Sequence, residues 1–201
     1  MDKFAFKAKS YDKEERRVAN VKNIANKIID SIPLNKNMRA IDFGSGTGLL
    51  LENIAPYVKE IIAIDKSPSM NEVLSQKIPK LDCKVEIKEI DNTKTDIDIK
   101  VDLILSSMTL HHIEDVKSIL QKFYNMLNNN GYIAIADLDI EDGSFHQVDT
   151  GVYHFGFDRK ELVKVAKEIG FKDIKIDDAS IIKKPYGEYS VFLLTAKKAS
   201  N

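Results

Sequence analysis

The chain has 201 residues, of which 43% are hydrophobic and 30% are charged, and its 30 basic and 31 acidic side chains leave a formal net charge of −1. This length can bury a full hydrophobic core, so we predict a single domain over residues 1–201. The balanced charge gives no reason to expect a nucleic-acid or anionic-lipid partner, and no apolar run is suited to a signal peptide or a membrane span. The lone cysteine, Cys83, excludes an internal disulfide and a thiolate metal cluster. We therefore expect a cytoplasmic monomer or homodimer that binds neither nucleic acid nor membranes.

The first predicted element is an amphipathic helix over residues 13–31, where apolar residues recur at helical spacing before Pro33 ends the pattern. We interpret residues 1–31 as an amino-terminal cap. Short strands rich in Ile, Val and Leu are expected at about 38–43, 60–65, 84–89, 101–106 and 131–137. Helices are expected between them near 48–55, 69–78 and 114–128, the last stopped by Asn128-Asn129-Asn130-Gly131. This alternation indicates an α/β fold with an open, mostly parallel sheet and helices on both faces.

The carboxyl-terminal part changes character. Asp158 is placed to cap a helix over 159–169, and Gly170 follows it. Two further strands are expected at about 172–178 and 188–197, joined by Pro185-Tyr186-Gly187. A Pro/Gly turn between such runs predicts an antiparallel hairpin at the end of the sheet.

A glycine-rich turn follows the first strand, in the sequence Asp42-Phe43-Gly44-Ser45-Gly46-Thr47-Gly48. Alternating glycines let the backbone turn sharply and keep side chains away from a ligand lying across the turn. A dinucleotide fingerprint would need its third glycine at position 49, which is Leu49. The carboxylate of Asp42 suits a ligand with positive charge, such as the α-amino group of S-adenosylmethionine (SAM). An ordinary Gly-rich turn without a ligand is the alternative.

A second carboxylate, Asp65, closes the next strand 21 residues after Gly44, where it can accept both hydroxyls of an adenosine ribose. Asp42, the glycine turn and Asp65 together resemble the class I SAM-dependent methyltransferases, and the resemblance covers about residues 4 to 196. It implies a Rossmann-like, seven-stranded sheet in the order 3-2-1-4-5-7-6 with strand 7 antiparallel. It also implies SAM as cofactor, S-adenosylhomocysteine (SAH) as product, and cofactor contacts at Asp42, Gly44, Ser45, Gly46, Gly48, Asp65 and Lys66.

The turn after the third strand carries Asp91 and Asn92. In the resembled family an acidic residue at this place often accepts a hydrogen bond from the adenine amino group, which makes Asp91 the matching residue and Asn92 its neighbour in the site. A solvated turn aspartate is the alternative reading.

The segment after the fourth strand is Ser106-Ser107-Met108-Thr109-Leu110-His111-His112. It resembles the strand-4 signature of small-molecule methyltransferases, in which the serine turn, here Ser106 and Ser107, lies near the methionine part of the cofactor. The resemblance implies that His112, and less directly His111, contacts substrate or cofactor. His112 could instead help to cap the helix that begins near Glu114.

The connection after the fifth strand, residues 138–157, shows little helical or strand pattern and is long for a compact domain, so we predict a lid-like insertion. All four histidines of the protein, including His146 and His154, follow the fourth and fifth strands, which predicts a concave site between them. The spacing of His146, Asp149 and His154 matches no metal motif, and we predict no metal site.

At the amino terminus, Phe4-x-x-x-Ala8-x-x-Tyr11-Asp12 resembles the leading segment of the ubiquinone/menaquinone C-methyltransferase-like branch. The aromatic residues of that segment fold over the cofactor, which implies a cofactor contact for Tyr11. The alternative is that Phe4 and Tyr11 only pack on the core.

These patterns favour an enzyme that transfers a methyl group from SAM to a small-molecule acceptor by in-line displacement. Histidine is the natural general base near neutral pH, so His112, and after it His146 or His111, is the candidate that orients or deprotonates the acceptor. Two alternatives stay open: a non-catalytic SAM- or SAH-binding protein, and an NAD-dependent oxidoreductase, which Leu49 and Asp42 disfavour.

Overall fold

The computed structural model describes residues 2, 5–8, 10–91, 95, 97–146, 148 and 151–200; Phe4, Asn92 and Asp149 lie outside them. The strands are β1 (Arg39–Phe43), β2 (Glu60–Asp65), β3 (Lys84–Glu89), β4 (Val101–Ser107), β5 (Leu127–Leu138), β6 (Phe171–Lys184) and β7 (Gly187–Lys198). The α-helices are α1 (Ala5–Ala8), α2 (Glu15–Ser31), α3 (Leu49–Ile54), α4 (Pro68–Lys77), α5 (Val116–Met126) and α6 (Arg159–Ile169). Short 3₁₀ turns are η1 (Tyr11–Lys13), η2 (Ala55–Tyr57), η3 (Ile78–Lys80) and η4 (Leu110–His112).

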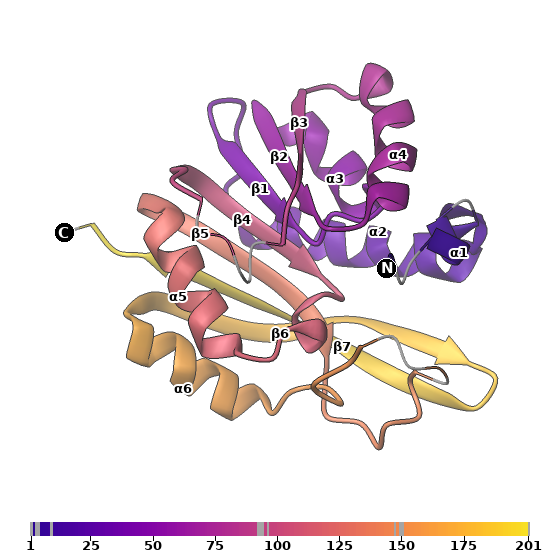
Figure 1. The fold of residues 1–201 in the computed structure, drawn as a ribbon. Helices are drawn as coiled ribbons and strands as arrows, with labels where there is room; N and C mark the ends of the chain where they lie inside the picture. Colours follow the sequence, from indigo (N-terminus) through magenta and orange to yellow (C-terminus); the bar gives the residue numbers. More distant parts are fainter. Residues whose placement is uncertain are drawn as a thin grey trace.

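The seven strands form one sheet in the order β3-β2-β1-β4-β5-β7-β6 (Figure 1). Strands β1 to β5 pair in parallel, whereas β7 is antiparallel to both β5 and β6. The predicted fold class and strand order are therefore confirmed. The connections from β1 to β2, from β2 to β3 and from β4 to β5 carry helices, as is usual between parallel strands, and the antiparallel edge follows from the hairpin that joins β6 to β7.

Helices cover both faces of the sheet (Figure 1). Ala40 of β1 and Leu103 of β4 belong to an apolar cluster with α2 and α3, and Ile41 and Ile104 belong to a second cluster with α5 and α6. Neighbouring residues of one strand thus point to opposite faces, and both faces are buried. This double burial explains why the parallel strands read as nearly continuous apolar runs.

Two element boundaries, the start of β5 and the end of β6, differ from the sequence prediction by more than two residues. The run Asn128–Asn130 was expected outside the strands, but β5 already begins at Leu127, which pairs with Val101. The register then shifts before Leu103 pairs with Tyr132, and Asn130 takes a positive φ of 64°, so the extra residues are absorbed in an irregular part of the ladder. Strand β6 also continues to Lys184, because its outer half pairs with β7 as far as Gly187.

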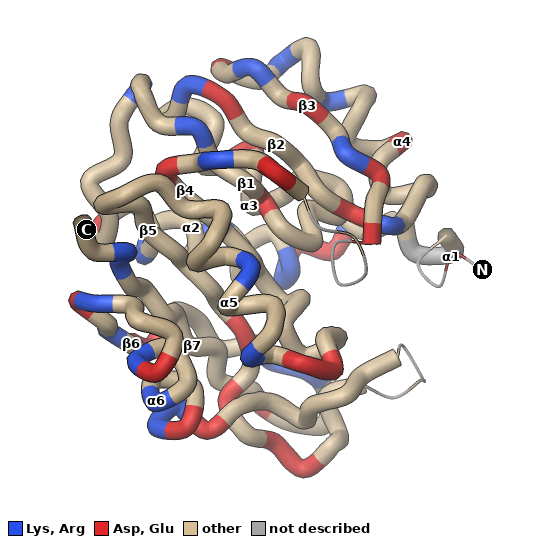
Figure 2. Tube along the Cα trace, turned by 60° about the vertical axis from the view of Figure 1, so that its left-hand side comes forward, with Lys and Arg blue, Asp and Glu red and all other residues tan. Residues whose placement is uncertain are grey.

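Lys and Arg residues alternate with Asp and Glu residues along the trace, and Figure 2 shows no broad area of one sign over the residues that it describes in this view. This distribution agrees with the formal net charge of −1. Of the helices that the structure describes, none has the length and apolar character needed to cross a membrane.

Candidate functional site

The glycine turn after β1 is built from three residues with left-handed backbone, Gly44, Gly46 and Gly48, whose φ angles are 72°, 53° and 83°. A Cβ at Gly44 would lie 2.2 Å from Oγ1 of Thr109, so this glycine allows the turn to pack against the segment after β4. A Cβ at Gly46 would meet no described atom within 4 Å. Gly44 is thus required for packing, and Gly46 leaves open space in front of the turn.

Asp42 lies just before this turn with 2% of its surface exposed. Within the described part of the chain its Oδ2 atom has no hydrogen-bond partner. Burial, and then the neighbouring charge of Asp65, raise the pKa of Asp42 to about 7. A buried carboxylate oxygen without a partner is costly, and a bound ammonium group would satisfy it. The turn therefore fits a ligand that carries a positive charge at this point.

Asp65 is held in a fixed orientation at the end of β2. Its two oxygens accept hydrogen bonds from the backbone N–H of Gly46 and of Ser67, each at 2.8 Å. Burial raises the pKa of Asp65, and these two hydrogen bonds oppose the rise. Lys66, which follows, is exposed, and its charge lowers the pKa of both Asp65 and His112. The charge of Lys66, at the end of β2, therefore acts both on Asp65 and on His112, which follows β4.

The three candidate serines differ in their contacts. Ser106 donates its hydroxyl to the carbonyl of Phe43 at 3.0 Å, so it links β4 to β1. The hydroxyls of Ser45 and Ser107 are buried and have no hydrogen-bond partner among the described residues. These two hydroxyls, like Oδ2 of Asp42, are polar atoms that a ligand could satisfy.

The amino-terminal segment packs on the glycine turn through η1. Asp12 accepts a hydrogen bond from Oγ1 of Thr47 at 2.5 Å and pairs with Lys77 at 2.5 Å. Arg17 lies over the ring of Tyr11, 4.0 Å from its centroid. Burial raises the pKa of Tyr11, and Asp65 is among the charges that add to this effect. The hydrogen bond between Asp12 and Thr47 thus places η1, which includes Tyr11, beside the glycine turn.

Asp91 follows β3, at the same edge of the sheet, and its backbone carbonyl accepts the N–H of Thr95 at 3.1 Å. Asn92, its predicted neighbour in the site, lies outside the described residues.

The turn η4 carries the histidine pair across the glycine turn from Asp65. Met108, just before it, has a positive φ of 54° and donates its N–H to the carbonyl of Ala136 at 2.9 Å. Such a conformation is uncommon for a residue with a side chain, and residues of this kind concentrate at functional sites. This sharp turn directs His111 toward β5.

His111 is 1% exposed and is bound to a carboxylate that the sequence analysis did not identify, Asp137 at the end of β5. Nδ1 of His111 lies 2.6 Å from Oδ1 of Asp137, and the backbone N–H of His111 donates to Oδ2 at 3.2 Å. Since a carboxylate accepts, Nδ1 of His111 donates the proton of this hydrogen bond. The signal for Asp137 was available, because it ends an apolar strand as Asp42 and Asp65 do.

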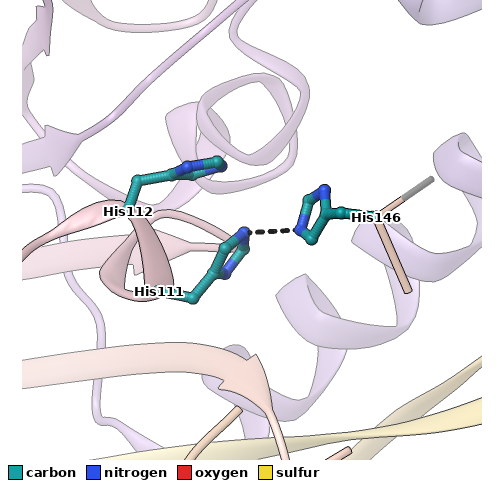
Figure 3. A group of neighbouring side chains, drawn as sticks. All are labelled: His111, His112 and His146. Atoms are coloured by element: carbon teal, nitrogen blue, oxygen red, sulfur yellow. Dashed lines mark hydrogen bonds between the residues drawn. The ribbon is translucent and has the colours of Figure 1, made fainter. Parts of the chain in front are cut away.

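His112 and His146 complete a cluster around His111 (Figure 3). Nδ1 of His112 lies 3.1 Å from the carbonyl of Gly151, which again assigns the proton to Nδ1. Burial, followed by the charge of His111, lowers the pKa of His112 to about 4, so this imidazole is neutral at pH 7. Nε2 of His146 lies 3.2 Å from Nε2 of His111. The structure thus brings the three predicted catalytic histidines together.

The fourth histidine, His154, lies apart from this cluster. Its Nε2 atom donates to the carbonyl of Ile113 at 2.9 Å, and its ring packs against Phe157. The backbone N–H groups of Tyr153 and His154 donate to the carbonyl of His111 at 3.0 and 3.2 Å. The loop after β5 therefore returns along η4 and covers the histidine pair.

Both ends of this loop are anchored. Arg159 forms two hydrogen bonds to Asp139, at 2.6 and 2.7 Å, and a third to Asp178 at 2.7 Å. Nearer the histidines, Ser144 and Tyr189 share a hydrogen bond of 2.6 Å, and Lys184 lies 3.5 Å from the ring centroid of Phe145. The loop is thus fixed to β6 and β7 on both sides of His146.

Residues 13–176 match the methyltransferase domain family, so the chain belongs to this family. The chain is 26% identical over 191 residues to an uncharacterised methyltransferase of Schizosaccharomyces pombe, a match that covers 87% of this chain and 65% of that protein. An uncharacterised methyltransferase of Bacillus cereus is 26% identical over 147 residues, covering 72% of this chain and 62% of that protein. The chain thus spans somewhat less than two thirds of the length of these curated relatives.

Among solved structures, phosphoethanolamine N-methyltransferase 2 of Haemonchus contortus, in complex with phosphomonomethylethanolamine and SAH, has a TM-score of 0.73 at 16% identity. The likeness covers 89% of this chain and 52% of that one. The [4+2]-cyclase SpnF has a TM-score of 0.73 at 15% identity, covering 90% of this chain and 81% of that one. At these identities the likeness establishes the fold, and the second protein illustrates that this fold also serves a different reaction.

Proposed function

We propose that the protein transfers a methyl group from SAM to a small-molecule acceptor and releases SAH. The observation that carries this proposal is the buried carboxylate of Asp42, whose Oδ2 atom has no partner among the described residues and lies beside the open glycine turn. Membership of the methyltransferase domain family supports the same conclusion.

The residues around the turn have separate tasks toward the cofactor. Asp42 accepts the α-ammonium group, which replaces the missing hydrogen bond and favours the ionised carboxylate. Asp65 accepts the ribose hydroxyls while the N–H groups of Gly46 and Ser67 hold it in place. Gly46 leaves room for the ligand backbone, and Tyr11 covers it from the amino-terminal side.

When bound, SAM supplies an electrophilic methyl group on a positively charged sulfur. Transfer requires the acceptor atom about 3–3.5 Å from the methyl carbon, in line with the leaving sulfur, and a site without bulk water. We assign the placement of the acceptor to His112 and His146, and the exclusion of water to the 138–157 loop, which acts as a lid. His111 is held by Asp137, which fixes its ring beside those of His112 and His146.

The alternative from another class is a protein that binds SAM or SAH without catalysis. The cluster of three histidines, of which His111 is buried, speaks against it, because a binding protein has no need to keep three imidazoles in contact. An NAD-dependent oxidoreductase is disfavoured by Leu49 and by Asp42, which would face a pyrophosphate with a carboxylate.

Isothermal calorimetry with SAH and with NAD tests the cofactor, and a screen of metabolite extracts with methyl-labelled SAM identifies the acceptor. With the acceptor known, His112→Ala should lower kcat by about 10²–10⁴-fold and leave SAH affinity nearly unchanged. Full activity of this variant would remove His112 from the reaction, and binding of NAD without SAH would refute the proposal as a whole.

A further inference from the structure

We propose that His111, His112 and His146 form a binding site for one divalent transition-metal ion, with zinc as the ion that the ligand set suits best. One nitrogen from each of the three imidazoles can be chosen so that all three lie within 4.8 Å of one another. Figure 3 shows the rings of the three side chains turned toward a common space. The inference rests on the proposed function only for what the ion would do there, and not for the ion's presence.

The spacing of the ring nitrogens is close to that of a coordination sphere. Zinc–nitrogen bonds of about 2.0–2.1 Å in a tetrahedral arrangement place two ligand nitrogens about 3.3 Å apart. The Nε2 atoms of His111 and His146 are 3.2 Å apart, close to one edge of such a tetrahedron. The widest separation within the cluster is below 4.8 Å, so a movement of about 1–2 Å by one side chain completes the geometry.

The hydrogen bonds on the other side of the rings support the same assignment. A metal-bound histidine usually donates its second N–H to a carboxylate or a backbone carbonyl, which fixes the ring and raises its basicity. His111 has the carboxylate of Asp137 at 2.6 Å from Nδ1, and His112 has the carbonyl of Gly151 at 3.1 Å from Nδ1. In two of the three rings Nδ1 is thus the donor, which leaves Nε2 as the nitrogen to bind a metal.

The choice of metal follows from the ligands. Three imidazole nitrogens suit zinc, copper, iron or nickel, and they suit magnesium and calcium poorly because those ions prefer oxygen. Cys83 precedes β3 at the amino ends of the parallel strands, whereas the histidines lie at the carboxyl ends of β4 and β5, so no thiolate joins the set. The sequence prediction of no metal site was based on the spacing of His146, Asp149 and His154. The contact that η4 creates between His111, His112 and His146 could not be read from that spacing.

Three protein ligands leave at least one position for water or for a substrate atom, as in catalytic rather than structural zinc sites. Thr109, just before η4, contacts Gly44, so the turn that carries His111 and His112 begins beside the proposed cofactor site. The substrate class that fits is a small molecule with an ionisable hydroxyl or thiol. Its proton would go to solvent, its oxygen or sulfur would bond to the methyl carbon, and the electrons of the broken carbon–sulfur bond would stay on the sulfur of SAH.

The test uses untagged, full-length protein stripped of metal with a chelator, and titrates it with Zn²⁺ alone in a calorimeter. One equivalent should bind, and Co²⁺ in its place should give the absorption bands of a nitrogen-ligated, four-coordinate ion. His112→Asn and His146→Asn should each weaken binding by more than about 100-fold, and Asp137→Asn by about 10–100-fold, since it removes an outer partner only.

His154→Asn is the matched control, because His154 lies in the same loop but bonds to the carbonyl of Ile113. It should bind Zn²⁺ like the wild type. Thermal unfolding of each metal-free variant identifies any variant that has lost its fold. The conclusion then rests on His112→Asn and His146→Asn, as far as they remain folded. Absence of saturable binding in the wild type, or equal affinity in His112→Asn, His146→Asn and His154→Asn, would overturn the site.

A parallel titration with SAH separates this proposal from the proposed function. Zn²⁺ binding without SAH binding would leave the metal site standing and refute the methyltransferase. SAH binding without Zn²⁺ binding would do the reverse.

Discussion

Replacing Asp42 with Asn removes a charge that the fold keeps buried without a partner, so the variant should be more stable than the wild type and bind the cofactor less tightly. Burial and Asp65 raise the pKa of Asp42 from 3.8 to about 7. Ionising this carboxyl in the ligand-free protein therefore costs about 4 kcal/mol relative to the unfolded chain.

The sign of the pH dependence follows from proton counting. Between about pH 4 and pH 7 the folded protein holds a proton on Asp42 that the unfolded chain has released, so the free energy of unfolding falls as pH rises through this window. From pH 5 to pH 8 the loss attributable to Asp42 is about 2–3 kcal/mol. Asp42→Asn cannot ionise and should lack this part of the pH dependence.

Cofactor binding should show the opposite trend, because an α-ammonium group favours the ionised carboxylate. At pH 6 about nine in ten molecules of the free protein carry the proton on Asp42, and SAH must displace it. Below about pH 7 the affinity of the wild type for SAH should thus fall by up to about tenfold for each pH unit. The affinity of Asp42→Asn for SAH should be at least about tenfold lower than that of the wild type at pH 8, and this difference should shrink toward pH 6.

Urea unfolding at pH 5 and pH 8 measures the first effect, and calorimetry with SAH in buffers of different ionisation enthalpy counts the protons released. Asp82→Asn, at an exposed position before β3, controls for the loss of a carboxylate as such. The reasoning fails if wild type and Asp42→Asn lose the same stability between the two pH values, or if the wild type releases no proton at pH 6.

Two further substitutions probe the turn and the loop. Gly46→Ala and its control Gly143→Ala both place a side chain at positive φ, which costs about 1 kcal/mol of stability. Only Gly46→Ala also puts a methyl group in front of the glycine turn. Calorimetry should therefore show weaker SAH binding for Gly46→Ala and unchanged SAH binding for Gly143→Ala. Arg159→Lys keeps the charge but loses the paired hydrogen bonds to Asp139. The free energy of unfolding should fall by about 1 kcal/mol, and the amide hydrogens of the described part of the 138–157 loop should exchange faster. The control Arg16→Lys, at an exposed position, should change neither the stability nor the exchange rate.

The parts of the molecule that the sequence predicted are those set by local patterns. The strands and the glycine turn follow from short apolar runs and from residues a few positions apart, as with Gly44 and Gly48, whereas the strand order was implied by the resemblance to the methyltransferase family. The run Asn128–Asn130 misled the prediction because asparagine favours turns, and the pairing of Leu127 with Val101 overrode that preference.

The contacts of the histidines could not be predicted in the same way. His111 and His146 are 35 residues apart, and the contact between them depends on the path of a loop with no regular pattern. Asp137 could have been included as a strand-end carboxylate, but its pairing with His111 required knowing that η4 turns toward β5. Sequence reasoning therefore identified the residues of this cluster more readily than the bonds between them.

The two buried carboxylates at the ends of β1 and β5, Asp42 and Asp137, show how the site divides its work. Asp137 is satisfied within the protein by His111 and by the N–H of Leu138, whereas Asp42 has an oxygen without a described partner. A carboxylate that is satisfied within the protein positions its partner, whereas an unsatisfied buried oxygen lowers stability until a ligand binds it. The unsatisfied carboxylate lies on β1 and the satisfied one on β5, with the contact of Thr109 and Gly44 between them. Under the proposed function, cofactor recognition belongs to β1 and acceptor placement to β4 and β5, so the two tasks can vary separately.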